Sequence, residues 1–193
     1  MATKFLIAGL GNVGAEYAGT RHNIGWDILD ALAAKYKQFF VAERLAEKVE
    51  IRLRGNVLVG IKPTTFMNLS GRAVKYWMDK ENISLERILV IMDDLALPLS
   101  RLRLRPGGSD AGHNGLTSIQ ESLGTSSYPR LRFGVGNNFP RGRQVEYVLG
   151  KWSPEELPLV RMKIEKSVEL IESFVSIGID RTMNLYNNLE FEL

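Results

Sequence analysis

Apolar residues recur along the first part of the chain with two different periods. The segment from Lys4 to Ala8 is a short apolar run followed by glycines, which is typical of a buried strand. Apolar residues then return every three or four positions, at Ile24, Ile28, Leu29, Leu32 and Tyr36. This spacing places them on one face of a helix. The chain therefore begins with a predicted strand, a glycine-containing loop and a helix.

The next part of the pattern predicts two strands joined by a tight turn. Glu47 to Leu53 and Val57 to Lys62 have the composition of strands. Between them stands Arg54-Gly55-Asn56, where Gly and Asn would supply the positive φ angles that a hairpin turn requires. We therefore expect a β-hairpin over these residues.

The rest of the chain continues to alternate between the two periods. A helix is predicted from Ser70 to Lys80, with Asn68 or Ser70 as its cap. The segment Arg101 to Arg105 alternates with period two, so its leucines face the core and its arginines face the other way. The remaining predicted elements are the strands Ile88 to Met92 and Arg130 to Gly136, a loop from Pro106 to Gly112, a helix from Gly115 to Leu123, and a long amphipathic helix from Pro154 onward.

Strands and helices thus alternate along the chain, with one hairpin and neither an internal repeat nor a linker. A chain of 193 residues is long enough to bury a sizeable core without disulfides or metals. We predict an α/β fold, a single domain over residues 1–193, with a twisted mixed β-sheet surrounded by α-helices.

Composition narrows the chemistry and the location. The chain has no cysteine, which excludes disulfides, thiolate nucleophiles and cysteine-based metal sites. Its first residues turn glycine-rich too early for a signal peptide or a membrane span, so we expect a cytoplasmic protein that does not enter a membrane. The net charge is only +3, but residues 100–151 carry eight Lys/Arg against three Asp/Glu. This basic segment could face phosphates, although solvated surface charge is the default interpretation.

The glycine pattern from Gly9 to Gly14 matches that of a dinucleotide-binding loop, but its context does not. A helix should begin at the third glycine, whereas six further residues precede Arg21. The acidic residue expected to follow a second strand is Asp30, which falls inside the predicted first helix. The context of the glycine pattern therefore argues against nucleotide binding.

Two histidines and a pair of acids are the candidates for acid–base chemistry. His22 and His113 are the only histidines, and an asparagine follows each. A lone histidine is more often structural, but His22 lies just before a predicted helix start, where the positive end of the dipole favours the neutral, proton-accepting ring. Asp93 and Asp94 end a predicted core strand, where one of them could orient a histidine or simply cap a turn.

Asparagines in three loops add uncharged hydrogen-bonding groups. Asn12, Asn68 and Asn114 lie beside glycines or at element boundaries, where asparagine often serves only as a turn former or cap. Their amides also suit the recognition of a peptide backbone or a nucleotide edge. No nucleophile elbow, phosphate loop or metal-ligand spacing of histidines occurs in the sequence, so we expect no metal.

Together these motifs resemble the bacterial-type peptidyl-tRNA hydrolases. The resemblance runs from about Lys4 to Asn187 and is carried by Thr20-Arg21-His22-Asn23, Thr64 to Gly71, Asp93-Asp94-Leu95 and Gly112 to Gly115, in this order and spacing. It implies hydrolysis of the ester between a peptide and the 3′ end of tRNA, which recycles the tRNA. It also implies that no cofactor is needed, that the protein is a monomer, and that no obligate protein partner is required.

The resemblance also assigns roles to individual residues. His22 would be the general base that activates water, and Asp93 would orient it. The residues expected to bind substrate or line the cleft are Asn12, Tyr17, Met67, Asn68, His113 and Asn114. Arg105 and Arg132 align with positions where the family places basic contacts to tRNA phosphates, and both lie in the basic segment.

Several positions depart from the usual pattern of the family. They are Val13 for a common proline, Met92 for a frequent histidine, Ala96 for an aspartate, Ser100 for a glycine, and Asp110-Ala111 in place of smaller residues. None removes an expected catalytic group, but Asp110 adds negative charge near the expected tRNA path. The alternative function is that of a non-catalytic RNA-binding relative, resembling a chloroplast group II intron splicing factor, against which the retained His22 and asparagines argue.

Overall fold

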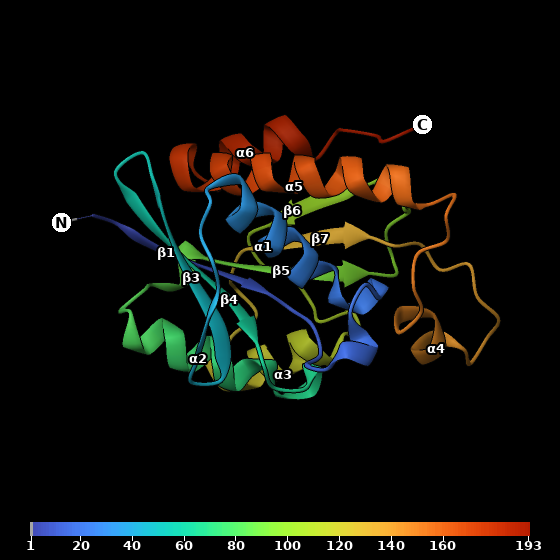
Figure 1. Cartoon of the computed structure of the whole chain (residues 1–193), viewed down its shortest axis with the longest axis horizontal. Coiled ribbons are helices and arrows are strands. Elements are labelled where there is room, and N and C mark those ends of the chain that lie inside the picture. Colours follow the sequence, from blue (N-terminus) through green and yellow to red (C-terminus); the bar gives the residue numbers. More distant parts are fainter. Residues whose placement is uncertain (1) are drawn as a thin grey trace.

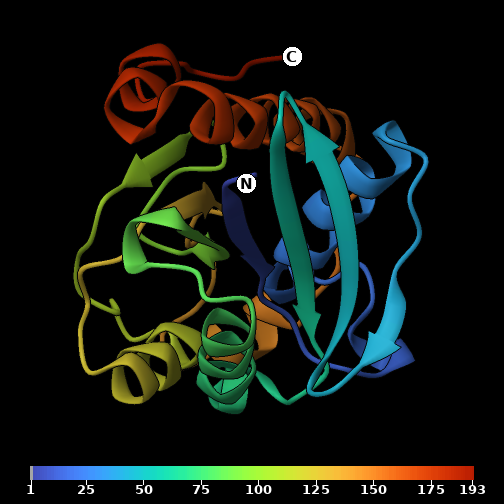
Figure 2. The same ribbon diagram turned by 90° about the vertical axis from the view of Figure 1, so that its left-hand side faces the viewer.

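The computed structural model describes residues 2–193, and its centre is a seven-stranded mixed sheet. The strands lie in the order β2-β3-β4-β1-β5-β7-β6. The pairings β4–β1, β1–β5 and β5–β7 are parallel, whereas β2–β3, β3–β4 and β6–β7 are antiparallel. Figure 2 shows the long β3–β4 hairpin toward the viewer. The strands are β1 (Lys4–Gly9), β2 (Val41–Glu43), β3 (Ala46–Leu53), β4 (Asn56–Pro63), β5 (Ile88–Asp94), β6 (Leu102–Arg105) and β7 (Arg130–Gly134).

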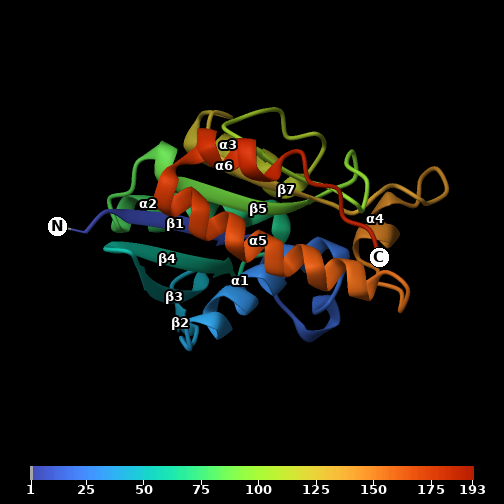
Figure 3. The same ribbon diagram turned by 90° about the horizontal axis from the view of Figure 1, so that it is seen from above.

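Helices cover both faces of this sheet. Figure 1 places α5 and α6 above the strands and α2 and α3 below them, while α4 lies apart at one end. Seen from above, α5 lies across the strands (Figure 3). The helices are α1 (Ile24–Lys35), α2 (Ser70–Lys80), α3 (Asn114–Leu123), α4 (Gln144–Val148), α5 (Leu157–Ile177) and α6 (Ile179–Tyr186). The predicted fold class is therefore confirmed.

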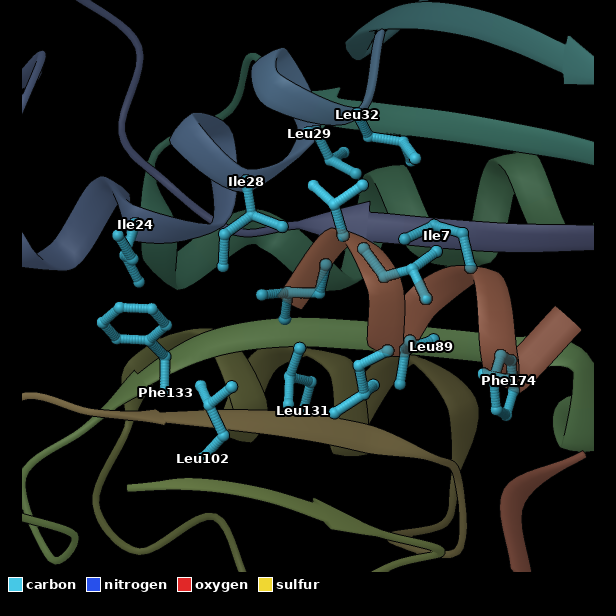
Figure 4. Packing of buried hydrophobic residues seen from close by; sticks show 14 of the residues in the cluster. Ile7, Ile24, Ile28, Leu29, Leu32, Leu89, Leu102, Leu131, Phe133 and Phe174 are labelled. Carbon is cyan, nitrogen blue, oxygen red and sulfur yellow. The ribbon is translucent and has the colours of Figure 1, made fainter. Parts of the chain in front are cut away.

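The core is divided by the sheet into two apolar clusters. Ile7 of β1 packs in the cluster beneath α1 and α5, whereas its neighbours Leu6 and Ala8 pack in the cluster against α2 and α3. Strands that are buried on both faces need apolar residues at successive positions, which explains the continuous apolar run in β1. Figure 4 shows side chains of α1 meeting those of β5 and β7 between the layers.

Most of the predicted helices and strands are present. The helices α4 and α6 and the strand β2 were not predicted as separate elements. The long helix expected from Pro154 is two helices, because Gly178 adopts a φ of 88° between α5 and α6. The helix α4 has five residues, of which only Val148 is buried, so it leaves little periodic signal. The strand β2 is exposed at all three positions and therefore shows no alternation of apolar and polar residues.

Two local predictions were wrong. The hairpin turn places its positive φ angles on Arg54 and Gly55, at 49° and 82°, while Asn56 already pairs with Leu53 in the ladder. The helix from Ser70 has no side-chain cap, because a 3-10 turn over Met67–Leu69 runs directly into it. The Ser70 hydroxyl instead donates to the Met67 carbonyl at 2.7 Å.

The glycines that resemble a nucleotide-binding loop instead allow close packing of α1 on the sheet. A Cβ on Gly9 would lie 2.2 Å from the Gly25 carbonyl oxygen, and a Cβ on Gly25 would lie 2.5 Å from the Leu10 nitrogen. Helix α1 begins only at Ile24, after two 3-10 turns. The loop therefore brings the helix start, and His22 before it, against the carboxyl end of β1.

Candidate active site

The carboxyl ends of the central strands open into a cavity of about 540 Å³. Residues that follow β1 and β4 and that end β5 form its floor, and the start of α3 and the helix α4 form two of its sides. This is the usual location of ligand sites in open α/β sheets. The sequence-predicted residues that line it are Asn12, His22, Met67, Asn68, Asp93, His113 and Asn114.

His22 and Asp93 come from distant parts of the chain and are directly hydrogen-bonded. His22 lies in the 3-10 turn Arg21–Asn23, and its Nδ1 is 3.0 and 2.9 Å from the two carboxylate oxygens of Asp93. The His22 side chain is 12% exposed and the Asp93 side chain 2%. Because an ionised carboxylate can only accept, Nδ1 carries the proton, and the Nε2 lone pair is left free to take another.

His113 is the second histidine on the same carboxylate. Its Nε2 is 2.9 Å from Asp93 Oδ1, and its Nδ1 accepts from the backbone N–H groups of Gly115 and Leu116, at 3.1 and 3.4 Å. His113 is thus the N-cap of α3. The backbone donors fix Nδ1 as the acceptor, so Nε2 carries the proton and donates it to Asp93.

These two donors determine the ionisation of Asp93. Burial raises the pKa of the Asp93 carboxyl, but its interactions with His113 and then His22 outweigh burial and hold the pKa well below its usual range. Asp93 is therefore an anion near neutral pH. Of the two acids that end β5, this one orients a histidine.

His22, Asp93 and His113 also have the proximity of a metal site, since one ligand atom from each lies within 4.8 Å of the others. Their hydrogen bonds disfavour that use. A metal at His113 Nε2 would need a lone pair there, yet Nδ1 already holds the lone pair that caps α3. The arrangement fits a proton-sharing network better than a metal centre.

Asn12 is held in place by a residue that the sequence did not single out. The Asn23 side chain accepts from the Asn12 N–H at 2.9 Å and donates to its carbonyl at 3.0 Å. Asn12 Oδ1 accepts from the Met67 N–H at 2.7 Å. That contact assigns the amide orientation and leaves the Asn12 Nδ2 group as a donor at the pocket. The only sequence signal for Asn23 was its place beside His22.

Asn68 and Asn114 lie at the pocket with exposed side chains, while Met67 is buried in its floor. The sequence did not single out the apolar residues that also line the pocket. They are Phe66, Leu95, Phe139, Val145, Val148 and Leu149. Most of them belong to α4 and the segment around it, which gave no periodic signal.

Three predicted residues do not line the pocket. Tyr17 is half-buried in a 3-10 turn, where its carbonyl accepts from the Thr20 hydroxyl at 2.7 Å. Arg132 donates through Nε to Asp94, the second acid that ends β5. Arg105 is exposed and pairs in register with Arg130, at the end of β7 remote from Asp93.

The departures from the family pattern leave the hydrogen bonds at the pocket in place. The Ala96 N–H donates to Asp94 Oδ1 at 2.8 Å. Asp110 accepts from the Gly112 N–H and the Thr117 hydroxyl, each at 2.9 Å, and these bonds lower the pKa of its carboxyl. Asp110 therefore holds the turn that leads into His113. Met92 is a buried part of the pocket floor, Val13 is exposed, and the Ser100 carbonyl accepts from the Phe191 N–H.

None of the helices formed by residues 2–193 has the length and apolar character that crossing a bilayer requires.

Comparisons with known proteins identify the family to which this chain and its fold belong. A family model described as peptidyl-tRNA hydrolase matches residues 6–192. The chain is 53% identical to a peptidyl-tRNA hydrolase of Parabacteroides distasonis, over 96% of this chain and 99% of the relative. It is 52% identical to that of Porphyromonas gingivalis, over 95% of this chain and 100% of the relative. The crystal structure of the Acinetobacter baumannii enzyme superposes with a TM-score of 0.91 at 32% identity, over 98% of this chain and 97% of that one. The chain belongs to the peptidyl-tRNA hydrolase family.

Proposed function

We propose that this protein hydrolyses the ester bond between the peptide and the 3′ end of tRNA in peptidyl-tRNA. Family membership supports the reaction. The observation in the structure that carries the proposal is a buried carboxylate held by two histidines, one of which has a free nitrogen at the pocket. The family match does not favour the alternative of a non-catalytic RNA-binding protein.

In the first step His22 acts as the general base. Its Nε2 takes a proton from water as the water oxygen bonds to the ester carbonyl carbon, and the carbonyl π electrons move to the carbonyl oxygen. The resulting imidazolium is stabilised by the Asp93 carboxylate on Nδ1. Asp93 needs no proton of its own in this step.

In the second step the tetrahedral intermediate collapses. The bond from carbon to the 3′ oxygen of the ribose breaks, and His22 returns its proton to that oxygen, so the products are a peptide carboxylic acid and free tRNA. The Met67 N–H donates to Asn12 Oδ1 and Asn23 holds the Asn12 backbone, so the Asn12 Nδ2 group has a fixed direction and is our candidate for stabilising the oxyanion.

The remaining pocket residues position the substrate in this proposal. Asn68 and Asn114 bind the peptide backbone and the terminal adenosine, and Met67 and His113 form the floor. Tyr17 would contact substrate only beyond the cavity. Arg105 and Arg132 would contact phosphates of the acceptor stem, with Asp94 holding Arg132 in one orientation.

Localisation in the cytoplasm, a monomeric state and independence of an obligate protein partner remain predictions. Size-exclusion chromatography with light scattering tests the oligomeric state directly.

The assay that tests the proposed function is the release of labelled peptide from a purified peptidyl-tRNA. We expect multiple turnovers with intact tRNA as the second product. An ester that stays intact after prolonged incubation with folded protein would contradict the proposal. Binding of tRNA without release would instead support the RNA-binding alternative.

A further inference from the structure

Arg21 directly precedes His22, yet its guanidinium contacts a different wall of the pocket. Nη1 donates to the Tyr147 carbonyl at 3.1 Å, and Nη2 donates to Glu156 Oε1 at 3.0 Å. The guanidinium carbon lies 4.2 Å from the centre of the Tyr147 ring and 5.2 Å from that of Trp152. The Arg21 side chain is only 11% exposed. One side chain thus joins the turn that carries His22 to α4 and to the start of α5.

The backbone makes the same connection. The Arg21 N–H donates to the Gly150 carbonyl at 3.0 Å, and Thr20 forms an isolated β-bridge with Lys151. A Cβ on Gly150 would lie 2.9 Å from Arg21 Nη1, so the segment after α4 packs closely against the guanidinium. These contacts place the end of α4 beside the His22 turn.

Helix α4 has few other contacts to hold it. It has five residues, and only Val148 is buried. The Tyr147 hydroxyl donates to the Val135 carbonyl at 2.6 Å and provides a second attachment. A helix this short is not stable on its own, so its position depends on these tertiary contacts.

The position of α4 matters because it forms part of the pocket. Gln144, Val145 and Val148 of α4 line the cavity. If α4 moved away, the cavity would widen and lose part of its apolar lining, while Asp93 and His113 would keep their contact with each other.

We propose that Arg21 is a positioning residue that holds α4 against the His22 turn and thereby sets the pocket wall facing the acyl part of the substrate. The identity of that substrate rests on the proposed function, whereas the coupling of Arg21 to α4 does not. A lysine could not replace it, because the role uses two donors in a planar fork that also stacks on aromatic rings.

Hydrogen exchange followed by mass spectrometry tests the coupling without any activity measurement. In Arg21→Gln we expect amides of residues 144–151 to exchange roughly tenfold faster or more, because the segment loses the guanidinium contacts to Tyr147, Trp152 and Glu156 and keeps only its backbone bonds to Thr20 and Arg21 and the Tyr147 hydroxyl bond. The matched control is Glu172→Gln, which removes the charge from an ion pair with Lys35 at the opposite end of α1. It should leave exchange in 144–151 unchanged. Equal protection of this segment in wild type and Arg21→Gln would overturn the coupling.

Kinetics test the consequence for the pocket. For Arg21→Gln we expect KM to rise roughly tenfold for a substrate with a peptide of several residues, with kcat within about twofold and an unchanged pH profile. The rise should be smaller when the acyl group is a single N-acetylated amino acid, which reaches less of α4. A fall in kcat with KM unchanged would overturn the assignment, because it would show that Arg21 positions His22 and not α4. A wild-type protein without hydrolase activity would refute the proposed function but leave the exchange result valid.

Discussion

The pocket wall formed by β5, the His22 turn and the start of α3 differs from the wall formed by α4 in how firmly each is held. Asp93 accepts from two histidines, His113 also caps a helix, and Asn12 is bonded to both Asn23 and the Met67 backbone. Val145 on the α4 side is 70% exposed. The groups that would perform chemistry are fixed by several bonds each, whereas the groups that would accept a variable peptide are held by few.

This contrast has a physical rationale. Proton transfer requires donor and acceptor within hydrogen-bonding distance and in a defined orientation, so small displacements are costly to the rate. Apolar contact with different peptide side chains has no such directional requirement. Substitutions on the two walls should therefore have different kinetic signatures.

The largest expected effect is that of His22→Ala on the fixed wall. Removal of a general base typically lowers the rate about 10²–10⁴-fold, and we expect kcat for peptide release to fall by at least this much. The melting temperature and tRNA binding should change little, because His22 is at the surface of the pocket. Near-normal turnover would exclude His22 as the base.

A smaller loss is expected for Asp93→Asn. The amide would still contact His22 but could not stabilise the imidazolium, so kcat should fall about 10–10²-fold. Because the protonated form of His22 would lose its anionic partner, the acid limb of the pH–rate profile should move to lower pH. An unmoved profile would show that Asp93 does not act through His22.

On the α4 wall, Val145→Asp should act on binding. The new carboxylate would lie beside the apolar cavity and repel an anionic substrate, so KM should rise about three- to tenfold with kcat unchanged. Equal losses in kcat from Val145→Asp and from a substitution on the fixed wall would remove the distinction between the walls.

A buried lysine behind the sheet, outside both walls, destabilises the fold and leads to a prediction about stability. Lys163 is fully buried behind β7, where it donates to the Gly134 carbonyl at 2.6 Å, and burial lowers its pKa to about 6. The unfolded chain, with a lysine pKa near 10.5, binds more protons between these values, so this group makes stability rise with pH from about 6 to 10.5. Lys163→Met should raise the melting temperature most at pH 6 and progressively less toward pH 10.

Asp27 in α1 should show the opposite pH dependence with a smaller effect. Burial, then the nearby charge of Asp30, raise its pKa to about 6 from 3.8, against the opposing effect of Lys62. The folded state therefore binds the extra proton between these values, and stability falls as pH rises through this window. Asp27→Asn should raise the melting temperature slightly at pH 7 and not at pH 3.5. A gain of equal size at both pH values would point to a cause other than ionisation.

Much of the fixed wall could be predicted from the sequence because its residues occur in short motifs. His22, Asn68 and Asn114 stand within motifs that resemble a known family, and Asp93 ends a clear apolar strand. The residues alone could not decide between Asp93 and Asp94, and only the family resemblance named Asp93, since the choice depends on which face of β5 each side chain occupies. Arg132 donates a hydrogen bond to Asp94, whereas the histidines donate to Asp93.

The α4 wall could not be predicted, because its position comes from contacts between distant residues. Arg21 and Tyr147 are 126 positions apart and share one hydrogen bond to a carbonyl, which any residue at 147 could supply. A periodic apolar pattern arises from the residues that an element buries, and α4 buries only Val148, so it has no such pattern. Asn23 was missed for a related reason, since its partner is the backbone of Asn12.

The contact between Gly9 and Gly25 also has an evolutionary consequence. Each glycine leaves room for the backbone of the other segment, and Gly25 follows His22 by three residues. A methyl group at either position would push the start of α1 away from β1 and carry His22 with it, away from Asp93. A substitution at either position would therefore lower activity as well as stability, so selection acts on it through both. Descendants of this sequence should keep both glycines for as long as they keep the activity.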